Sequence, residues 1–383
     1  MHTSFHPVHM ITRVLRLKDE LSEVYANLII QTFAISLAGV FLPIFVINLG
    51  HSLDIALMFM LVFWIAHGIF VPFASKLSGV IGLKHSILIR IPLLVSFFAL
   101  LAWAPGIANN LSVLFFIAIL GGISEAIYWP SLHAVFIKNS SLVGETAQAG
   151  NLFAFPKFAA VVAPLLGATI LAVLGFPVLF AIVIVLMLLS VVPLFVTPDR
   201  RESVTIDKKV FSSSSVYALL FLSKGILKVS EAVMWPLFVF VMIGGFVNVG
   251  LAATFTALGI AIFTSFISKI TKKMRRHQLL KIGAIGYLVI WVLRIGATSI
   301  EEVILLSFFG GIFFSIISVL VYTFFADRAR GVHMMREVAF REIWLMFGMA
   351  LPILFALMFL EPATKFVFVF SLAAIISLLF VFI

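Results

Sequence analysis

The sequence predicts an all-α polytopic membrane protein with twelve transmembrane helices in two pseudo-symmetric six-helix bundles. Three observations support this fold class. Apolar residues make up 63% of the 383 residues and charged residues only 11%, which is more apolar surface than a water-soluble chain can bury. Long apolar runs follow one another, each near the roughly 20 residues that a helix needs to cross a bilayer. Basic residues gather in every second connection between these runs.

The apolar runs are expected to be helices, because a backbone exposed to lipid must satisfy its own hydrogen bonds and the runs are too long for barrel strands. In chain order we expect spans at 24–49, 53–74, 86–104, 111–137, 147–173, 176–197, 214–243, 247–268, 282–299, 303–326, 338–360 and 363–383. Residues 1–23 precede the first span and are not expected to act as a cleavable signal peptide, because they are polar and mixed in charge. The stretch from Met10 to Glu23 alternates apolar and charged residues, which favours a short interfacial helix over an irregular polar leader.

The charge distribution predicts the orientation. Nineteen of the 26 Lys and Arg residues lie in the N-terminal segment or in alternate connections, whereas the intervening connections hold only Lys365. Basic loops tend to remain on the cytoplasmic side. The sequence therefore predicts a multi-pass protein of the cytoplasmic membrane with both termini in the cytoplasm. The net charge of +10 is spread over several loops, so we expect it to face anionic lipid headgroups and not nucleic acid.

The longest polar stretch, residues 198–213, separates six spans from six and is expected to be a cytoplasmic linker. It divides the chain into a first bundle, 24–197, and a second, 214–383. A weak repeat supports this division. Lys84-His85 and Arg276-His277 lie 192 residues apart, as do Glu145 and Glu337, and Gly121-Gly122 and Gly310-Gly311 lie 189 apart. Repeats of this kind are typical of proteins whose two halves pack about a pseudo-two-fold axis.

These features resemble the major facilitator superfamily of secondary transporters, over residues 24–383. The loop between that family's second and third spans usually reads Gly-x-Leu-x-Asp-Arg-x-Gly-Arg-Lys. Here SKLSGVIGLKHS keeps Leu77, Gly82 and Lys84, but Gly79 replaces the Asp that takes part in the family's inter-helix charge lock. The sequence Ala163-Pro164-Leu165-Leu166-Gly167 is similar to the Gly/Pro-rich motif of the fifth span. The resemblance implies that spans one, four, seven and ten line a substrate path.

Charged residues within the spans point to a functional site, because a charge at mid-bilayer costs about 2.5–3.5 kcal/mol and usually faces a polar cavity or a partner. Lys224, Lys228 and Glu231 are spaced i, i+4, i+7 in the seventh span, which places them on one helical face. We expect the two lysines to attract an anionic group and Glu125, in the fourth span, to exchange a proton. The residues expected to bind the substrate are Gln31, Glu125, Trp129, Lys224, Lys228, Glu231, Trp235 and Tyr322.

A structural interpretation of the same charges stays open. Glu125 would pair with Lys157 and join spans four and five, while Lys228 and Glu231 would pair along one helical turn. Arg294 is expected to be structural, with its long stem reaching outward. Glu125 and Glu231 are each followed by Trp-Pro at offsets of four and five residues, which predicts a bend beside the site or a packing kink.

Other residues are expected to support or gate the bundle. They are Gly82, Lys84, Glu145, Lys157, Pro164, Gly167, Glu337 and Arg341. Glu337 and Arg341 are four residues apart and are expected to form a local pair. His67 and His133 are expected to make ordinary polar contacts, because no other ligands accompany either of them. We therefore expect no metal site and no cofactor.

The predicted function is secondary active transport of a small solute by alternating access, in a monomer coupled to a proton or another ion. The sequence contains no Gly-x-x-x-x-Gly-Lys-Ser/Thr motif, which would indicate nucleotide binding. It also contains no nucleophile–base set that would indicate an enzyme. The basic residues favour an anionic substrate, whereas the apolar and aromatic surroundings favour an amphiphilic or drug-like compound under efflux. The alternative is a transporter-like sensor or scaffold that moves no solute, which the eroded loop motif favours.

Overall fold

The computed structural model describes residues 20–106, 110–139, 156, 161–195, 214–330 and 334–382. Within these ranges all regular structure is helical, and eleven helices are long and apolar enough to cross a membrane. The predicted linker lies outside the described residues, as do most of the predicted interfacial helix and about half of the fifth span. Glu145 and Lys157 also lie outside them, so their predicted roles stay predictions.

The first half of the chain forms six spans in the order expected. The first span is α2 (Glu20–Ala38), the short turn η1 (Gly39–Phe41) and α3 (Leu42–Asn48), followed by α4 (Leu53–Ile81), α5 (Leu83–Trp103) and α6 (Leu111–Asn139). The helix α8 (Ala163–Ser190) holds two spans, because Gly175 within it has a φ of 80°, a left-handed conformation that interrupts the helix. The predicted boundary between spans five and six, at residues 174–175, is confirmed there.

The second half begins with a span that is not a regular α-helix. It runs through α9 (Ser215–Val229), η5 (Ser230–Met234), α10 (Trp235–Phe238) and η6 (Val239–Ile243). Both η5 and η6 are π-helical turns, each wider than an α turn, so the side chains beyond Ser230 leave the face that a 3.6-residue period predicts. The remaining helices are α11 (Phe246–Lys273), α12 (Arg276–Ile295), α13 (Ile300–Ala329), α14 (Met334–Ala356) and α15 (Pro362–Leu379).

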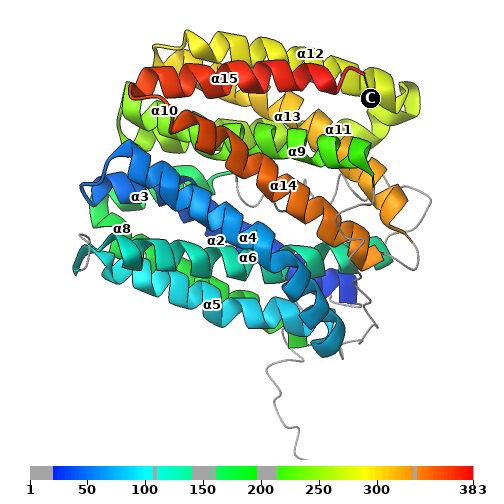
Figure 1. Ribbon diagram of the computed structural model, residues 1–383, viewed down its shortest axis with the longest axis horizontal. Helices are drawn as coiled ribbons and strands as arrows, with labels where there is room; N and C mark the ends of the chain where they lie inside the picture. Colours follow the sequence, from blue (N-terminus) through cyan, green and yellow to red (C-terminus); the bar gives the residue numbers. More distant parts are fainter. Residues whose placement is uncertain are drawn as a thin grey trace, which may run out of the picture.

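The two halves pack in the same pattern. In the first half α2 contacts α8, α4 contacts α6, and α5 contacts both α6 and α8. In the second half α9 contacts α14, α11 contacts α13, and α12 contacts both α13 and α15. The first half lies below the second in Figure 1, and the halves meet where α4 contacts α14 and α8 contacts α11. These matched contacts show two pseudo-symmetric six-helix bundles.

Two glycines make equivalent close contacts in the two halves. A Cβ atom on Gly122 of α6 would lie 2.4 Å from the Phe63 carbonyl oxygen of α4, and one on Gly311 of α13 would lie 2.2 Å from the Thr256 carbonyl oxygen of α11. Only glycine allows helix backbones to approach this closely. The correspondence predicted from the 189-residue offset is therefore confirmed by packing.

The loop between α4 and α5 is held by a buried ion pair. Gly82, with a φ of 102°, ends α4 and begins α5. Lys84 then extends its ammonium to Glu23 of α2, with Nζ 2.8 Å from Oε2, and both side chains are almost fully buried. Glu23 thus supplies the anion for a charge lock in a loop where Gly79 stands at the family's Asp position. We call the end of the molecule that holds Lys84, Arg276 and Arg328 the basic-loop face.

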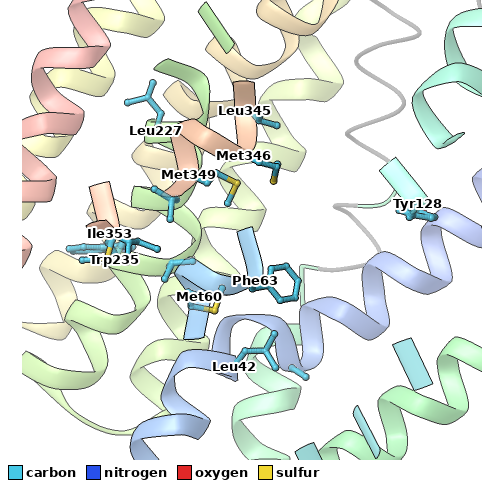
Figure 2. Packing of buried hydrophobic residues seen from close by; sticks show 14 of the residues in the cluster. Leu42, Met60, Phe63, Tyr128, Leu227, Trp235, Leu345, Met346, Met349 and Ile353 are labelled. Atoms are coloured by element: carbon cyan, nitrogen blue, oxygen red, sulfur yellow. The ribbon is translucent and has the colours of Figure 1, made fainter. Parts of the chain in front are cut away.

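The apolar core continues from one half into the other. Figure 2 shows Leu42, Met60 and Phe63 of the first half near Met346 and Met349 of α14. A Cβ atom on Gly68 of α4 would lie 3.2 Å from the Met346 Cβ. The α4–α14 contact is therefore a close-packed apolar seam, and charged residues lie beside it.

Candidate functional site

A chain of polar contacts runs through the first half and ends at Glu125. Arg90 of α5 donates hydrogen bonds to the Gln31 side-chain oxygen and to Glu125 Oε1. The Trp129 indole N–H donates to Glu125 Oε2 at 2.6 Å. Arg90 is buried, whereas 14% of the Glu125 side chain is exposed. The observed partner of Glu125 is thus Arg90, while the predicted alternative, Lys157, lies outside the described residues.

Lys228 extends from the second half onto two tryptophans of the first. Its Nζ lies 5.9 Å from the centroid of the Trp64 ring on α4 and 5.6 Å from that of the Trp129 ring on α6. Both distances are within the range of cation–π attraction. Lys228 is half-buried, and no hydrogen bond or ion pair to it is found among the described residues. The lysine therefore presents a cation at the meeting of the two halves without a fixed anionic partner.

Lys224 lies one helical turn before Lys228. Its Nζ donates to Ser318 Oγ of α13 at 2.5 Å and lies 3.5 Å from the centroid of the Phe314 ring. The two lysines are close enough to interact electrostatically. The structure therefore brings Lys224 and Lys228 together as expected from their spacing.

A second polar group joins the halves through Glu342 of α14. His67 Nε2, from α4, lies 3.8 Å from Glu342 Oε2, and His133 Nε2, from α6, lies 3.5 Å from Oε1. Arg341 also pairs with Glu342. The His133 Nδ1 lies 2.9 Å from the hydroxyl of Tyr322 on α13, so His133 contacts two helices of the second half.

The ordinary polar contact predicted for His133 is found with Tyr322, whereas neither ring nitrogen of His67 has a hydrogen-bond partner among the described residues. Both rings approach the same carboxylate, which the sequence did not predict. Sequence reasoning missed Glu342, since an acid directly after Arg341 near the start of a helix is typical of a solvated pair. It also missed Arg90, which lies in an apolar run 35 residues before Glu125. A charge inside a span is the signal that marks both residues.

Glu231 and Trp235 are buried in the interior of the second half, where Glu231 also acts electrostatically on Lys224. Arg294 of α12 binds both Glu231 oxygens, at 2.7 and 2.9 Å, and the Tyr287 hydroxyl donates to Glu231 at 2.6 Å. The Trp235 indole N–H donates to Ser307 Oγ of α13 at 2.8 Å. The predicted face shared with Lys224 and Lys228 stays a prediction, since the direct partners of Glu231 are Arg294 and Tyr287 of α12.

Two other predictions for these residues, one pairing and one side-chain direction, are wrong. Glu231 does not pair with Lys228, since Arg294 and Tyr287 occupy its oxygens. The Arg294 stem does not reach outward: the residue is 0% exposed, and its guanidinium lies 4.4 Å from the ring centroids of both Trp235 and Trp291.

The predicted pair of Glu337 and Arg341 is replaced by contacts with other residues. Glu337 binds Arg328 of α13 at 2.8 Å and Arg336 at 3.4 Å, while Arg341 binds Glu342. The Glu337–Arg328 pair ties the start of α14 to the end of α13. It lies at the basic-loop face.

The central groups carry an excess of positive charge. By residue type, the central groups contain four basic side chains, those of Arg90, Lys224, Lys228 and Arg341, and two acidic side chains, those of Glu125 and Glu342. An excess of positive charge in a low-dielectric setting attracts anions. Within the described part of the chain, no group of three His, Cys, Asp or Glu residues is arranged to hold a metal ion.

Two six-helix bundles with charged groups between them are typical of secondary transporters. The family model described as Major Facilitator Superfamily matches residues 24–250, more than half of the chain. The chain therefore belongs to the Major Facilitator Superfamily, whose members are transporters and not enzymes.

Solved structures share the fold. The human organic anion transporter MFSD10 (TETRAN) has a TM-score of 0.68 at 12% identity, covering 95% of this chain and 98% of its own. The E. coli fucose:proton symporter FucP has a TM-score of 0.66 at 13% identity, covering 94% and 97%. A bacterial homologue of the iron transporter ferroportin, in its outward-facing state, has a TM-score of 0.65 at 15% identity, covering 95% and 99%. Among curated protein sequences none matches this chain. Identities this low establish the fold alone.

Proposed function

We propose that this protein is a secondary active transporter that moves a small anionic solute across the cytoplasmic membrane by alternating access. The observation that carries the proposal is Lys228, which lies half-buried between the halves with no hydrogen bond or ion pair among the described residues, so that Glu342 and Glu125 act on it only from a distance. A cation kept in that position costs free energy unless an anion offsets it. The excess of positive charge around Lys228 supports the same choice of solute.

The rings beside Lys228 favour a solute with an apolar or aromatic part. Trp64 and Trp129 are both partly exposed and flank the ammonium from two helices of the first half. An amphiphilic anion would place its charge on Lys228 and its apolar part on these rings. Efflux of such a compound from the inner leaflet is the second candidate function, and the exposed rings favour it.

The ion that drives transport is proposed to be a proton. Glu125 is the acceptor predicted from the sequence, and that role stays a prediction. Its two oxygens accept hydrogen bonds from Arg90 and Trp129, and protonation would remove the negative charge that pairs with Arg90. Replacing Glu125 with Gln would test the role, since flux driven by a pH gradient should be lost while solute exchange persists.

The substrate class can be tested with purified protein in proteoliposomes. The probe is p-toluenesulfonate, which joins an aromatic ring to a permanently ionised group, followed by a panel of other aromatic sulfonates and carboxylates. We expect Lys228→Met to lower uptake of accepted anions about 10-fold or more, equal to about 1.4 kcal/mol, and Lys228→Arg to retain much of it. The matched control is Lys281→Met, which removes an exposed lysine of α12.

Two results would overturn the proposal. Equal anion uptake by the Lys228→Met variant and the unmodified protein would remove the lysine from the site. Absence of flux for every anion and every uncharged solute in the panel would favour the sensor or scaffold alternative. A thermal-shift screen of the same panel gives an independent reading, because a ligand that binds only the folded state raises the melting temperature.

A further inference from the structure

Glu342 is the carboxylate through which the second half contacts two imidazoles of the first. His67 lies on α4 and His133 on α6, and their Nε2 atoms approach the two different oxygens of Glu342. The side chain of Glu342 is 2% exposed, that of His67 0% and that of His133 4%. Three titratable groups are thus buried together at the interface between the two halves, which must open during alternating access.

His67 is an unusual member of this group. Neither of its ring nitrogens has a hydrogen-bond partner among the described residues, although the residue is fully buried. A buried polar group without a partner is costly. Its 3.8 Å separation from Glu342 exceeds a hydrogen bond, but it suits an ion pair when the ring carries a proton.

Titratable or charged groups surround Glu342 on α14 itself and on the helices packed against it. On α14 itself Arg341 binds the carboxylate. The other groups near it are His67 on α4, His133 and Glu125 on α6, Lys228 on α9 and Tyr322 on α13, with Arg90 of α5 acting on His67. The charged residue of α15 is Lys365, which binds the Phe359 carbonyl near the opposite end of α14.

We propose that His67, His133 and Glu342 form a site for one proton between the two halves, and that this proton controls how firmly the halves are joined. With the proton bound, an imidazolium faces a carboxylate across the interface, and the attraction holds α4 and α6 to α14. Without it, two neutral rings face the carboxylate at distances too long for strong hydrogen bonds. The proton comes from water on one side of the membrane, forms an N–H or O–H bond in the cluster, and returns to water on the other side.

The position of Lys228 gives this site a link to the solute, which rests on the proposed function. Lys228 interacts electrostatically with Glu342, and the central region already carries an excess of positive charge. A bound anion would offset that charge and so favour the additional proton. Since such coupling is reciprocal, the proton would strengthen anion binding by the same factor. The two would then cross the membrane together, as in a symporter.

The test measures the separation of the halves against pH and does not require the solute. The chain has no cysteine, so two introduced cysteines can be spin-labelled without background. Val80→Cys at the end of α4 and Lys273→Cys at the end of α11 place exposed labels on opposite halves at the basic-loop face. Distances are measured by electron–electron double resonance from about pH 5 to about pH 9, the range in which histidine ordinarily changes its charge.

We expect a short, narrow distance at low pH and a growing population of longer distances as the pH rises. Glu342→Gln should abolish this pH dependence, because the amide keeps the shape but cannot form the ion pair. His67→Gln is the second variant and should weaken the pH dependence, which keeps the test valid if Glu342→Gln does not fold. The matched control is Asp327→Asn, which removes an exposed carboxylate of α13 and should leave the pH profile unchanged.

The proposal would be overturned if the distances in the unmodified protein did not change with pH. It would also be overturned if Glu342→Gln kept the pH dependence of the unmodified protein. If Glu342→Gln does not fold, the same result in His67→Gln would overturn it. Failure of the proton site and failure of the transport proposal are distinguishable. Anion flux that depends on Lys228, combined with pH-independent distances, would remove only the proton site. A pH-dependent distance without any solute flux would leave the proton site in a protein that is not a transporter.

Discussion

The two halves each contain a buried arginine paired with a glutamate, but the pairs differ in what surrounds them. In the second half, Arg294 is 0% exposed and binds both oxygens of Glu231, which Tyr287 also contacts. In the first half, Arg90 binds one oxygen of Glu125, and the glutamate side chain stays 14% exposed. The sealed pair is therefore placed to hold a bundle together, and the open pair is placed to meet a partner.

The local sequences around the two glutamates do not reveal this difference. Each glutamate is followed by Trp-Pro, yet Trp129 donates back to Glu125 on its own helix, whereas Trp235 donates across to Ser307 on α13. The π turn at Ser230–Met234 redirects the second motif into the core. The two Glu-x-x-x-Trp-Pro motifs thus have different contacts, because one lies in an α-helix and the other passes through a π turn.

The largest expected effect follows from breaking the sealed pair. Arg294→Met leaves Glu231 buried without its cation, which should lower the free energy of unfolding by about 3–5 kcal/mol. Denaturant or thermal unfolding in detergent measures the change. Arg90→Met should cost less stability, because Glu125 keeps partial contact with solvent, and should reduce transport instead. Equal stability losses in the two variants would contradict the comparison.

The two basic residues related by the 192-residue repeat should also differ. Lys84 is buried with Glu23, whereas Arg276 and its partner Asp327 are 37% and 40% exposed. We expect Lys84→Met to lower the free energy of unfolding by about 3 kcal/mol, since it strands a buried carboxylate. Arg276→Met should change it by about 1 kcal/mol or less. A loss from Arg276→Met as large as that from Lys84→Met would show that exposure does not govern these pairs.

Glycine contacts are the feature in which the halves should behave alike. A Cβ atom on Gly167 would lie 2.0 Å from the Leu37 carbonyl oxygen, and one on Gly348 would lie 2.0 Å from that of Leu222. Gly167→Ala and Gly348→Ala should each cost about 1–3 kcal/mol through overpacking. The control is Gly106→Ala, where no atom lies within 4 Å of the new Cβ. Clearly unequal costs at the two positions would weaken the structural repeat.

The smallest expected effect concerns the ion pair opposite the basic-loop face. Lys365 Nζ of α15 lies 2.9 Å from Asp54 Oδ1 of α4, and the Asp54 side chain is 43% exposed. Lys365 is buried, but it also donates to the Ala356 and Phe359 carbonyls and so keeps partners when the carboxylate is removed. Asp54→Asn should therefore lower the free energy of unfolding by about 1 kcal/mol or less, and high salt should mask the change. Thermal unfolding at two salt concentrations checks both statements. A salt-independent loss well above this value would indicate a buried pair.

The sequence predicts the fold well and the central site in part. Hydropathy sets the spans because lipid demands long apolar helices, and Gly175 marks a boundary that composition alone locates. Lys224 and Lys228 lie at the centre because a helical period of 3.6 residues places them on one face. Gln31, Glu125, Trp129 and Tyr322 also belong to the central contacts.

The remaining contacts could not be predicted, because they depend on how distant helices rotate against one another. His67 and Glu342 lie 275 residues apart, and Arg90 reaches Glu125 from a different helix. Glu231 could not be assigned its partners from periodicity, because Arg294 and Tyr287 lie on a different helix, more than 50 residues along the chain. Charge inside a span identifies such residues, but three-dimensional packing selects their partners.

The π turn of the seventh span has a mechanical consequence. A single additional residue in a turn rotates the helix beyond it by roughly 100° relative to an uninterrupted α-helix. The side chains of Lys228 and Trp235 therefore point in directions around the helix axis that differ from those of an uninterrupted α-helix. The segment with Trp235 is bound inside the second half, whereas Lys228 contacts tryptophans of the first half. A force on the Lys228 ammonium would then twist the helix at this π turn, where the backbone hydrogen bonds are most easily rearranged.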